Sequence, residues 1–478
     1  MRLRQLSVFS ILPIAPQLAN LVMPLTPPWD DMRVKHEWNT VPSNWESLGP
    51  PPFNTTIDLH FALKPHHETA LIDALYEVST PGSPKYVFSN ASHARCTHFV
   101  PLFRHRYGAH LSKAQVSQLV EPSPDTLELV NSWLEHHRVP TSSISITHGG
   151  GWLTVTGVLV SQANEMLGAS YQVYRQSGMN GTMILRTVGY ALPTVLHSHV
   201  NTVIPTTYFG STDALRRTPR RHVVGADTPS KRQLSSRKDD DDDNDDDDDD
   251  EIFPSMLRSL YRTAAYVPAA TDKNRLGVAG LVKNHPDKKD LKLFMEFCRK
   301  DAIDATFNVV ELNGVVHNPR RPSDEANQNI QYSQAIAYPT PQTFYSIGGD
   351  ISILPGSNLP AADDLDQVFL NYLLNEESVP QTISISYGNQ EKNLPFAYAD
   401  AICNLYARLG ARGVTVLVPS GNEGVGPEPD DEDFEDCIAD KETGRIQFIT
   451  DFPASCMCIA LLPLPLGEAY RAFASTGF

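Results

Sequence analysis

The segment SDEANQNIQY, residues 323–332, places two polar side chains where they could act together. Glu325 and Asn329 are four residues apart, so on a helix they lie on the same face, one turn apart. An acidic residue at both positions would suit an acid–base pair. Here the second position carries an amide. Taken alone, the segment also fits an exposed helical turn with a polar face, so its surroundings must decide between the two interpretations.

The segment lies in the second half of the chain, where apolar runs alternate with helical patterns. That succession predicts a doubly wound, mostly parallel α/β sheet, in which chemistry gathers at the carboxyl ends of the strands. The YG of SISYG and the SGNEG that contains Asn422 each follow such a strand. The strands are expected over 276–282, 305–312, 342–349, 381–388 and 413–421, with helices such as 290–300 and 396–410 between them.

Residues 50–210 have the pattern of a separate α+β unit. TIDLHFAL (56–63) alternates like a half-buried strand, with Ile57, Leu59 and Phe61 on one face. Further expected elements are helices over 67–79, after Ser123-Pro124 and from Ser161, and a hairpin around the glycines at 149–151.

One stretch of this unit, residues 87–105, has no clean period and is expected to be an insertion. It contains Cys96 and two histidines, but one cysteine with irregularly spaced histidines does not make a metal site.

A polar linker over 211–251 separates the two units. It opens with basic pairs and ends in DDDDDNDDDDDDE (239–251), a composition that cannot bury a core. The linker is either a solvated spacer or a processing segment, since an exposed Lys231-Arg232 pair suits trypsin-like or kexin-like cleavage. We favour cleavage because each unit looks complete locally.

Length and charge exclude some classes of function. A chain of 478 residues predicts two domains and a linker. Its net charge of −17 comes mostly from the acidic run, which leaves about −5 for the remaining residues. Without a basic domain we expect no nucleic-acid partner. Beyond the N-terminus no run approaches the roughly 18 apolar residues of a membrane helix, so we expect no membrane partner. We also expect a monomer.

The N-terminus indicates secretion. Residues 1–24 combine two arginines, an apolar stretch and small residues near Ala19, as a signal segment does, although prolines interrupt the stretch; a simple N-terminal extension is the alternative. Glycosylation triplets at Asn54, Asn90 and Asn180 agree with an extracellular location. Six cysteines show no metal-ligand spacing; four lie after residue 400 and allow one or two disulfides of undetermined pairing.

Several segments, taken in order, resemble one family. EANQNIQY, AYPTPQTFYSIGG, TISISYG, RLGARGVTVLVPSGNEGVG and DFPASC are similar to segments of the sedolisins, the serine-carboxyl peptidases, and most of all to their fungal tripeptidyl-peptidases. The N-terminal unit, including DMRVKHEWNTVPSNWESLG and TLELVNSWLEHH, resembles the family's activation propeptide. The resemblance implies a ferredoxin-like propeptide over 30–210 and a truncated, subtilisin-like peptidase domain over 252–478. It also implies a secreted zymogen that works at acid pH.

The resemblance further implies roles for three residues. Glu325 matches the family's general base, Asn329 occupies the position of its supporting aspartate, and Asn422 that of its oxyanion aspartate. A carboxylate base stays ionised at a pH that would protonate histidine. An amide at Asn422 can still donate to an oxyanion, which is worth about 10²–10³ in rate. The amide at Asn329 lacks the charge that orients the base, and such a change in a chymotrypsin-like triad costs about 10⁴.

The family's serine lies in a G-T-S motif beyond FPASC, and the 478 residues contain no GTS. The nucleophile therefore has no candidate here, and the family's calcium site would also be missing. We expect a chain that is inactive as it stands, from a family that releases tripeptides from protein N-termini. The alternatives are a non-catalytic homologue that binds peptides or inhibits related peptidases, and a faulty gene model in which 87–105 is an unspliced intron.

Overall fold

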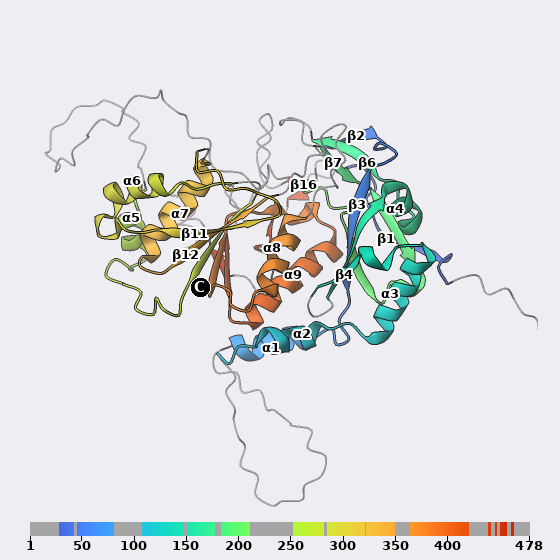
Figure 1. Ribbon diagram of the computed structural model, residues 1–478, viewed down its shortest axis with the longest axis horizontal. Helices are drawn as coiled ribbons and strands as arrows, with labels where there is room; N and C mark the ends of the chain where they lie inside the picture. The colour runs from blue at the N-terminus through green and yellow to red at the C-terminus, as the bar shows by residue number, and fades with distance from the viewer. Residues whose placement is uncertain are drawn as a thin grey trace, which may run out of the picture.

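The computed structural model describes residues 28–42, 45–80, 108–147, 151–176, 183–210, 252–281, 284–320, 322–348, 364–419, 438–440, 445–446, 450–456 and 460–462. These residues form five layers, which Figure 1 shows from right to left: helices, an antiparallel sheet, helices, a parallel sheet and helices. The expected signal segment, insertion and linker lie outside the described residues. Within the described ranges, no helix has the length and apolar character needed to cross a membrane.

The first unit is built on a four-stranded antiparallel sheet with the order β4-β5-β3-β9. The predicted strand is confirmed as β3 (Thr56–Leu63), and Ile57, Leu59 and Phe61 are fully buried. They pack against α3 (Pro124–His136) and α4 (Val160–Leu167), which cover the outer face of the sheet. The side chain of Ser123 caps α3 by accepting from the backbone N–H of Thr126.

The other predicted elements of this unit are also present, together with elements that were not predicted. The helix expected over 67–79 is α1, and the hairpin expected around 149–151 is the pair β4/β5. The bounds are β1 (Met32–Glu37), β2 (Trp45–Gly49), α1 (Ala70–Ser79), α2 (Lys113–Val120), η1 (Thr141–Ser143), β4 (Ile144–Ile146), β5 (Trp152–Leu159), β6 (Gln172–Gln176), β7 (Met183–Arg186), β8 (Gly189–Pro193), η2 (Thr194–Leu196) and β9 (Val200–Ile204).

The second unit contains the predicted parallel sheet. Its order is β11-β12-β10-β13-β15-β19, and every neighbouring pair is parallel. The five predicted strands correspond to β10 (Leu276–Gly280), β11 (Phe307–Leu312), β12 (Gln342–Ile347), β13 (Thr382–Ile385) and β15 (Thr415–Pro419). The strand order reverses between β10 and β13, because β11 and β12 lie on one side of β10 and the later strands on the other.

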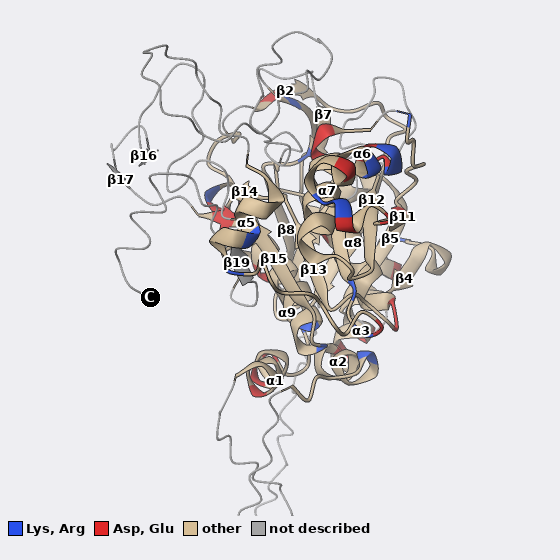
Figure 2. Cartoon of the chain, turned by 90° about the vertical axis from the view of Figure 1, so that its left-hand side faces the viewer, with Lys and Arg blue, Asp and Glu red and all other residues tan. Residues whose placement is uncertain are grey.

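Helices cover both faces of this sheet, as an all-parallel sheet requires. Successive residues of a strand point to opposite faces: Val278 and Phe344 contact α6 and α7, whereas Ala279 and Tyr345 contact α8 and α9. Lysines and acidic residues are mixed on α6, whereas the charged residues of α7 are the two acids of its first turn (Figure 2). The bounds of the further elements are α5 (Pro254–Leu260), α6 (Lys288–Cys298), η3 (Lys300–Ala302), α7 (Asp324–Ala337), α8 (Leu365–Asn375), β14 (Asn389–Gln390), η4 (Glu391–Asn393), α9 (Phe396–Ala411), β16 (Ile438–Asp440), β17 (Arg445–Ile446), β18 (Asp451–Phe452) and β19 (Ala460–Leu462).

The two units share the layer formed by α8 and α9. Trp152 and Ile204, on the inner face of the antiparallel sheet, belong to the same apolar cluster as both helices. The ring of Tyr208 stacks on that of Tyr398, with 4.2 Å between centroids. Asn201 Nδ2 donates to Asp400 at 2.8 Å. Helices α1 and α2 extend this junction by packing on the last turns of α9.

One disulfide joins Cys403 on α9 to Cys456, across 53 residues of sequence. Two of the four cysteines after residue 400 thus form one of the disulfides that the sequence allowed. Because Cys456 follows β18, the bond ties the segment after β15 to the shared helical layer.

Two acidic side chains at the start of α8 face the junction. Asp364 caps α8 by accepting from the N–H of Gln367, and it accepts from the Tyr398 hydroxyl at 2.7 Å. Burial raises the pKa of Asp364, although the nearby charge of Arg186 opposes this. Burial and then the charge of Asp364 raise the pKa of Asp366 to about 7.

We expect Asp366 to make the chain more stable at acid than at neutral pH. Its pKa is higher in the folded state than the ordinary value of 3.8, so folding takes up a proton between about pH 4 and 7. The stabilisation is therefore complete near pH 4 and is lost as the pH rises through 7. Asp366→Asn should raise the free energy of unfolding at pH 7.5 by about 1–2 kcal/mol. This is less than the full pKa difference would give, because the side chain is only half-buried.

Urea unfolding at pH 4.5 and 7.5 measures this effect. Asp304→Asn, at an exposed acidic residue, is the matched control and should leave the pH dependence unchanged. An equal pH dependence in the wild type and in Asp366→Asn would contradict the assignment.

Candidate functional site

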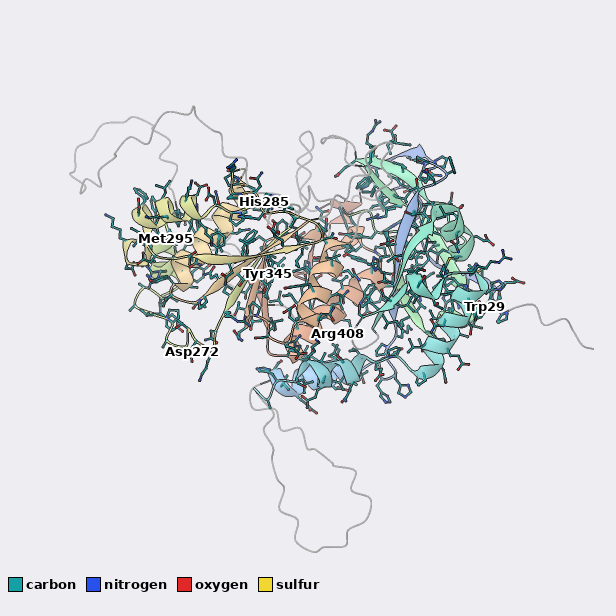
Figure 3. The ribbon with its side chains drawn as sticks, in the orientation of Figure 1. Trp29, Asp272, His285, Met295, Tyr345 and Arg408 are labelled. Carbon is teal, nitrogen blue, oxygen red and sulfur yellow. A yellow bond between two sulfur atoms is a disulfide. The ribbon has the colours of Figure 1, made fainter. Side chains whose placement is uncertain are left out.

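The carboxyl ends of β10 and β13 lie side by side at the point where the strand order reverses. In open α/β sheets this position forms a crevice that holds ligands. Asn284 follows β10, and Ser386 and Tyr387 follow β13. Helix α7 comes after β11 and brings Glu325 to these residues in its first turn. Figure 3 marks this end of the sheet by the label on His285.

The three segments meet at the Glu325 carboxylate. Asn284 Nδ2 donates to the Tyr387 hydroxyl oxygen at 2.5 Å and lies 3.4 Å from Glu325 Oε2. Tyr387 is 2 % exposed. Burial, followed by the negative charge of Glu325, raises the pKa of Tyr387 well above its usual value. The hydroxyl therefore stays protonated and can donate to the carboxylate.

Asn329 points to the same strand end, one turn further along α7. Ser386 Oγ donates to Asn329 Oδ1 at 3.4 Å. The Asn329 Nδ2 atom is buried and has no hydrogen-bond partner in the described part of the chain. The prediction that Glu325 and Asn329 share a helix face is thus confirmed, since both face consecutive residues of one segment. Because the Asn329 amide nitrogen has no acceptor, it does not donate to Glu325.

Hydrogen bonds fix the start of α7 against the end of β10. The backbone N–H of Ser323 donates to the His285 carbonyl oxygen at 3.0 Å. Asn327 accepts from the backbone N–H of Asp287 at 2.8 Å and donates to Asp290 at 2.7 Å. This double contact holds the first turn of α7, and with it Glu325, in one orientation.

Asn284 is fixed in turn by β12, the neighbour of β10 in the sheet. The fully buried Ser346 of β12 donates to the Asn284 carbonyl oxygen at 2.8 Å. Asn284 itself is 6 % exposed. The polar run KNH (283–285), shortly after a buried strand, was the available signal for Asn284, and the YG after SISIS was the signal for Tyr387. Sequence reasoning did not show that the two would meet.

Two histidines lie beside this arrangement. The rings of His285 and His317 are 5.6 Å apart, and burial is the main cause that lowers the pKa of both. Among the described residues no cluster of three His, Cys, Asp or Glu side chains could hold a metal ion. The expectation that the family's calcium site is missing stays a prediction, and no chemical step is assigned to a metal.

The remaining predicted site residues are not brought to this arrangement by the described structure. Asn54 is exposed on the turn before β3, so its glycosylation stays a prediction. Five others lie outside the described residues: Asn90, Asn180, Lys231, Arg232 and Asn422.

Comparison with known proteins adds two findings. The Pro-kumamolisin activation domain matches residues 103–209, a match that begins near the end of the expected insertion. Fungal peptidases match most of the chain. They include a probable tripeptidyl-peptidase SED3 of Arthroderma benhamiae, 29% identical over 452 residues, which are 92% of this chain and 68% of the relative.

Two relatives from Arthroderma otae give the same result. Tripeptidyl-peptidase SED2 is 27% identical over 94% of this chain and 70% of its own length. Tripeptidyl-peptidase SED4 is 26% identical over 89% of this chain and 64% of its own length. The chain thus spans about two thirds of the length of these relatives.

We expect Tyr387→Phe to destabilise the chain by about 1–3 kcal/mol. The hydroxyl is the one close partner of Asn284 Nδ2, and its removal leaves a buried donor with only the 3.4 Å contact to Glu325. Urea unfolding measures the loss. Tyr76→Phe, at a half-exposed tyrosine of α1, should change stability by less than about 0.5 kcal/mol. Equal stability of the two variants would show that the Asn284–Tyr387 contact is not made.

Proposed function

We propose, from the membership of this chain in the sedolisin family, that it is the precursor of an acid peptidase that releases tripeptides from protein N-termini. The observation that carries the proposal is the position of Glu325 at the switch point of the parallel sheet, where it is held by Asn284 and Tyr387. A general base in this family is a glutamate, and a carboxylate is still ionised when histidine is protonated. Peptides or proteins are the proposed substrates.

The strand orders support the finer fold assignment. In the first unit the order β4-β5-β3-β9, with α3 and α4 on one face, agrees with a ferredoxin-like arrangement of two β-α-β halves. We therefore propose a ferredoxin-like propeptide docked on a subtilisin-like peptidase domain. We also propose secretion, from the character of the first 24 residues and the disulfide Cys403–Cys456.

Within the site, Glu325 would take the proton of the nucleophile, and Tyr387 would orient the carboxylate by donating to it. Asn329 lacks the charge of a second carboxylate and does not donate to Glu325. Tyr387 and Asn284 are therefore the proposed positioning residues. Asn422 is proposed to donate to the oxyanion. The 478 residues hold no GTS motif, so we propose that this chain, expressed as it stands, does not cleave.

Hydrolysis of an N-terminally free tripeptide reporter near pH 4 tests the proposal. The 478-residue chain should release no product above background. Sequencing of the transcript across codons 85–110 and past codon 478 shows whether a product with a GTS segment exists. That product should hydrolyse the reporter, and Asn329→Asp should raise its kcat by about 10²–10⁴.

Glu325→Gln in the same product is the decisive control, because it keeps the side-chain shape and removes the base. Loss of activity is expected. Full activity of Glu325→Gln, or a pH optimum above 7, would overturn the assignment of the base.

A second candidate function follows from the amides at Asn329 and Asn422. A chain without these acids could bind related peptidases, or peptides, without cutting them. A nanomolar complex with an active family member would support this function, and the absence of a complex at micromolar concentrations would exclude it.

A further inference from the structure

Arg408 is a buried cation at the junction of the two units. It lies near the end of α9, is 7 % exposed, and is labelled in Figure 3 where α9 approaches α2. Its Nε atom donates to Asn404 Oδ1 at 3.2 Å. Its two terminal nitrogens lie against Gly151 of the first unit, where a Cβ atom would come within 2.9 Å of the guanidinium group. A Cβ atom at residue 151 would therefore require the guanidinium to shift.

The charge of Arg408 has no counter-charge among the described residues. No carboxylate there forms an ion pair with it, and burial alone lowers the pKa of Arg408 to about 10. Two other arginines differ. The buried Arg186 donates to the carbonyl oxygens of Leu185 and Tyr208 and lies near Asp364. The partly buried Arg412 donates to backbone carbonyl oxygens at the end of α8. An unpaired buried charge raises the free energy of the folded state, so an anion bound beside this guanidinium would be stabilising.

Arg408 also lines a cleft of about 690 Å³ between the units. Polar side chains on its wall include Asn404 and Ser455 from the second unit and Lys64 and Asn201 from the first. Trp152 adds an apolar surface. The cleft is large enough for a small organic anion, and its wall comes from both units.

The acidic residues of the cleft are already engaged. Asp400 accepts from Asn201, Glu68 lies 3.8 Å from Lys64, and Glu391 accepts from Thr450. Asp400 is two helical turns from Arg408, or about 12 Å along the axis of α9. The end of the cleft at Arg408 is thus the place where an anion is favoured.

We propose that Arg408 binds a small anion, a carboxylate or an inorganic oxyanion, in the cleft between the two units. The terminal nitrogens form a planar fork that matches two oxygens of such a group. Because Gly151 and Trp152 of the first unit border the same space, the bound anion would contact both units. A ligand that needs both units stabilises their docked arrangement by linkage. The inference is independent of the proposed peptidase function.

Thermal unfolding of the full 478-residue chain tests the proposal. Sodium sulfate and sodium acetate are each added to 20 mM at pH 6.5, and sodium chloride at equal ionic strength is the reference. We expect either anion to raise Tm by about 2 °C or more above the chloride reference. A larger shift with sulfate assigns the site to an oxyanion, and a larger shift with acetate assigns it to a carboxylate.

Arg408→Met separates binding from a general salt effect. This variant should lose the anion-specific shift and, without an anion, should unfold at the same or a higher Tm, because an unpaired buried charge has been removed. Arg175→Met, at an exposed arginine paired with Glu46, is the matched control and should keep the shift.

Calorimetry provides a test that does not depend on the stability of that variant. The wild type should bind sulfate or acetate with a measurable heat, and Arg408→Lys, which keeps the charge but loses the fork, should bind at least about 10-fold more weakly. The absence of binding at 20 mM of either anion, or equal shifts in the wild type and in Arg408→Met, would overturn the proposal.

Discussion

The burial of α9 on two opposite sides is the constraint on which the rest of the structure depends. A surface helix has one apolar stripe, whereas α9 is buried over most of its circumference: Tyr398, Ile402, Leu405, Tyr406 and Leu409 are at most 1 % exposed. The parallel sheet covers one side of the helix, and the antiparallel sheet with α1 and α2 covers another. Removing the first unit would expose this surface to water. The N-terminal unit is therefore part of the packing of the second unit rather than an appendage of it.

The position of Glu325 follows from the same sheet. Its partners come from the ends of β10 and β13, which are adjacent only because the strand order reverses there. The carboxylate is thus oriented by residues outside its own helix. This arrangement explains how a chain with an amide at Asn329 can still hold Glu325 in place. In the proposed mechanism the amide of Asn329 supplies no negative charge, so it would affect the basicity of Glu325 more than the position of its carboxylate.

Sequence periodicity predicted the elements but not the contacts between them. The alternation of Ile57, Leu59 and Phe61 and the apolar runs of the parallel sheet correspond directly to burial, so their strands were placed correctly. The shared face of Glu325 and Asn329 follows from helix geometry alone. The Asn284–Tyr387 bond joins residues 103 apart in sequence and needs the strand order, which local patterns do not contain. Local patterns likewise contain no information on the pairing of Cys403 with Cys456 or on the burial of α9 on two sides.

Charge balance at the junction connects these observations. Asp364, Asp366 and Arg186 bring two potential negative charges and one positive charge into a region of low dielectric. This group becomes neutral when the two carboxyl groups share one proton, a state that acid pH favours. Arg408, in the same interface, has no carboxylate partner within the described ranges, and a proton cannot neutralise a guanidinium. The anion proposed above would balance its charge. The junction would then need one proton and one anion for neutrality, and both requirements favour the docked arrangement in an acidic medium that contains small anions.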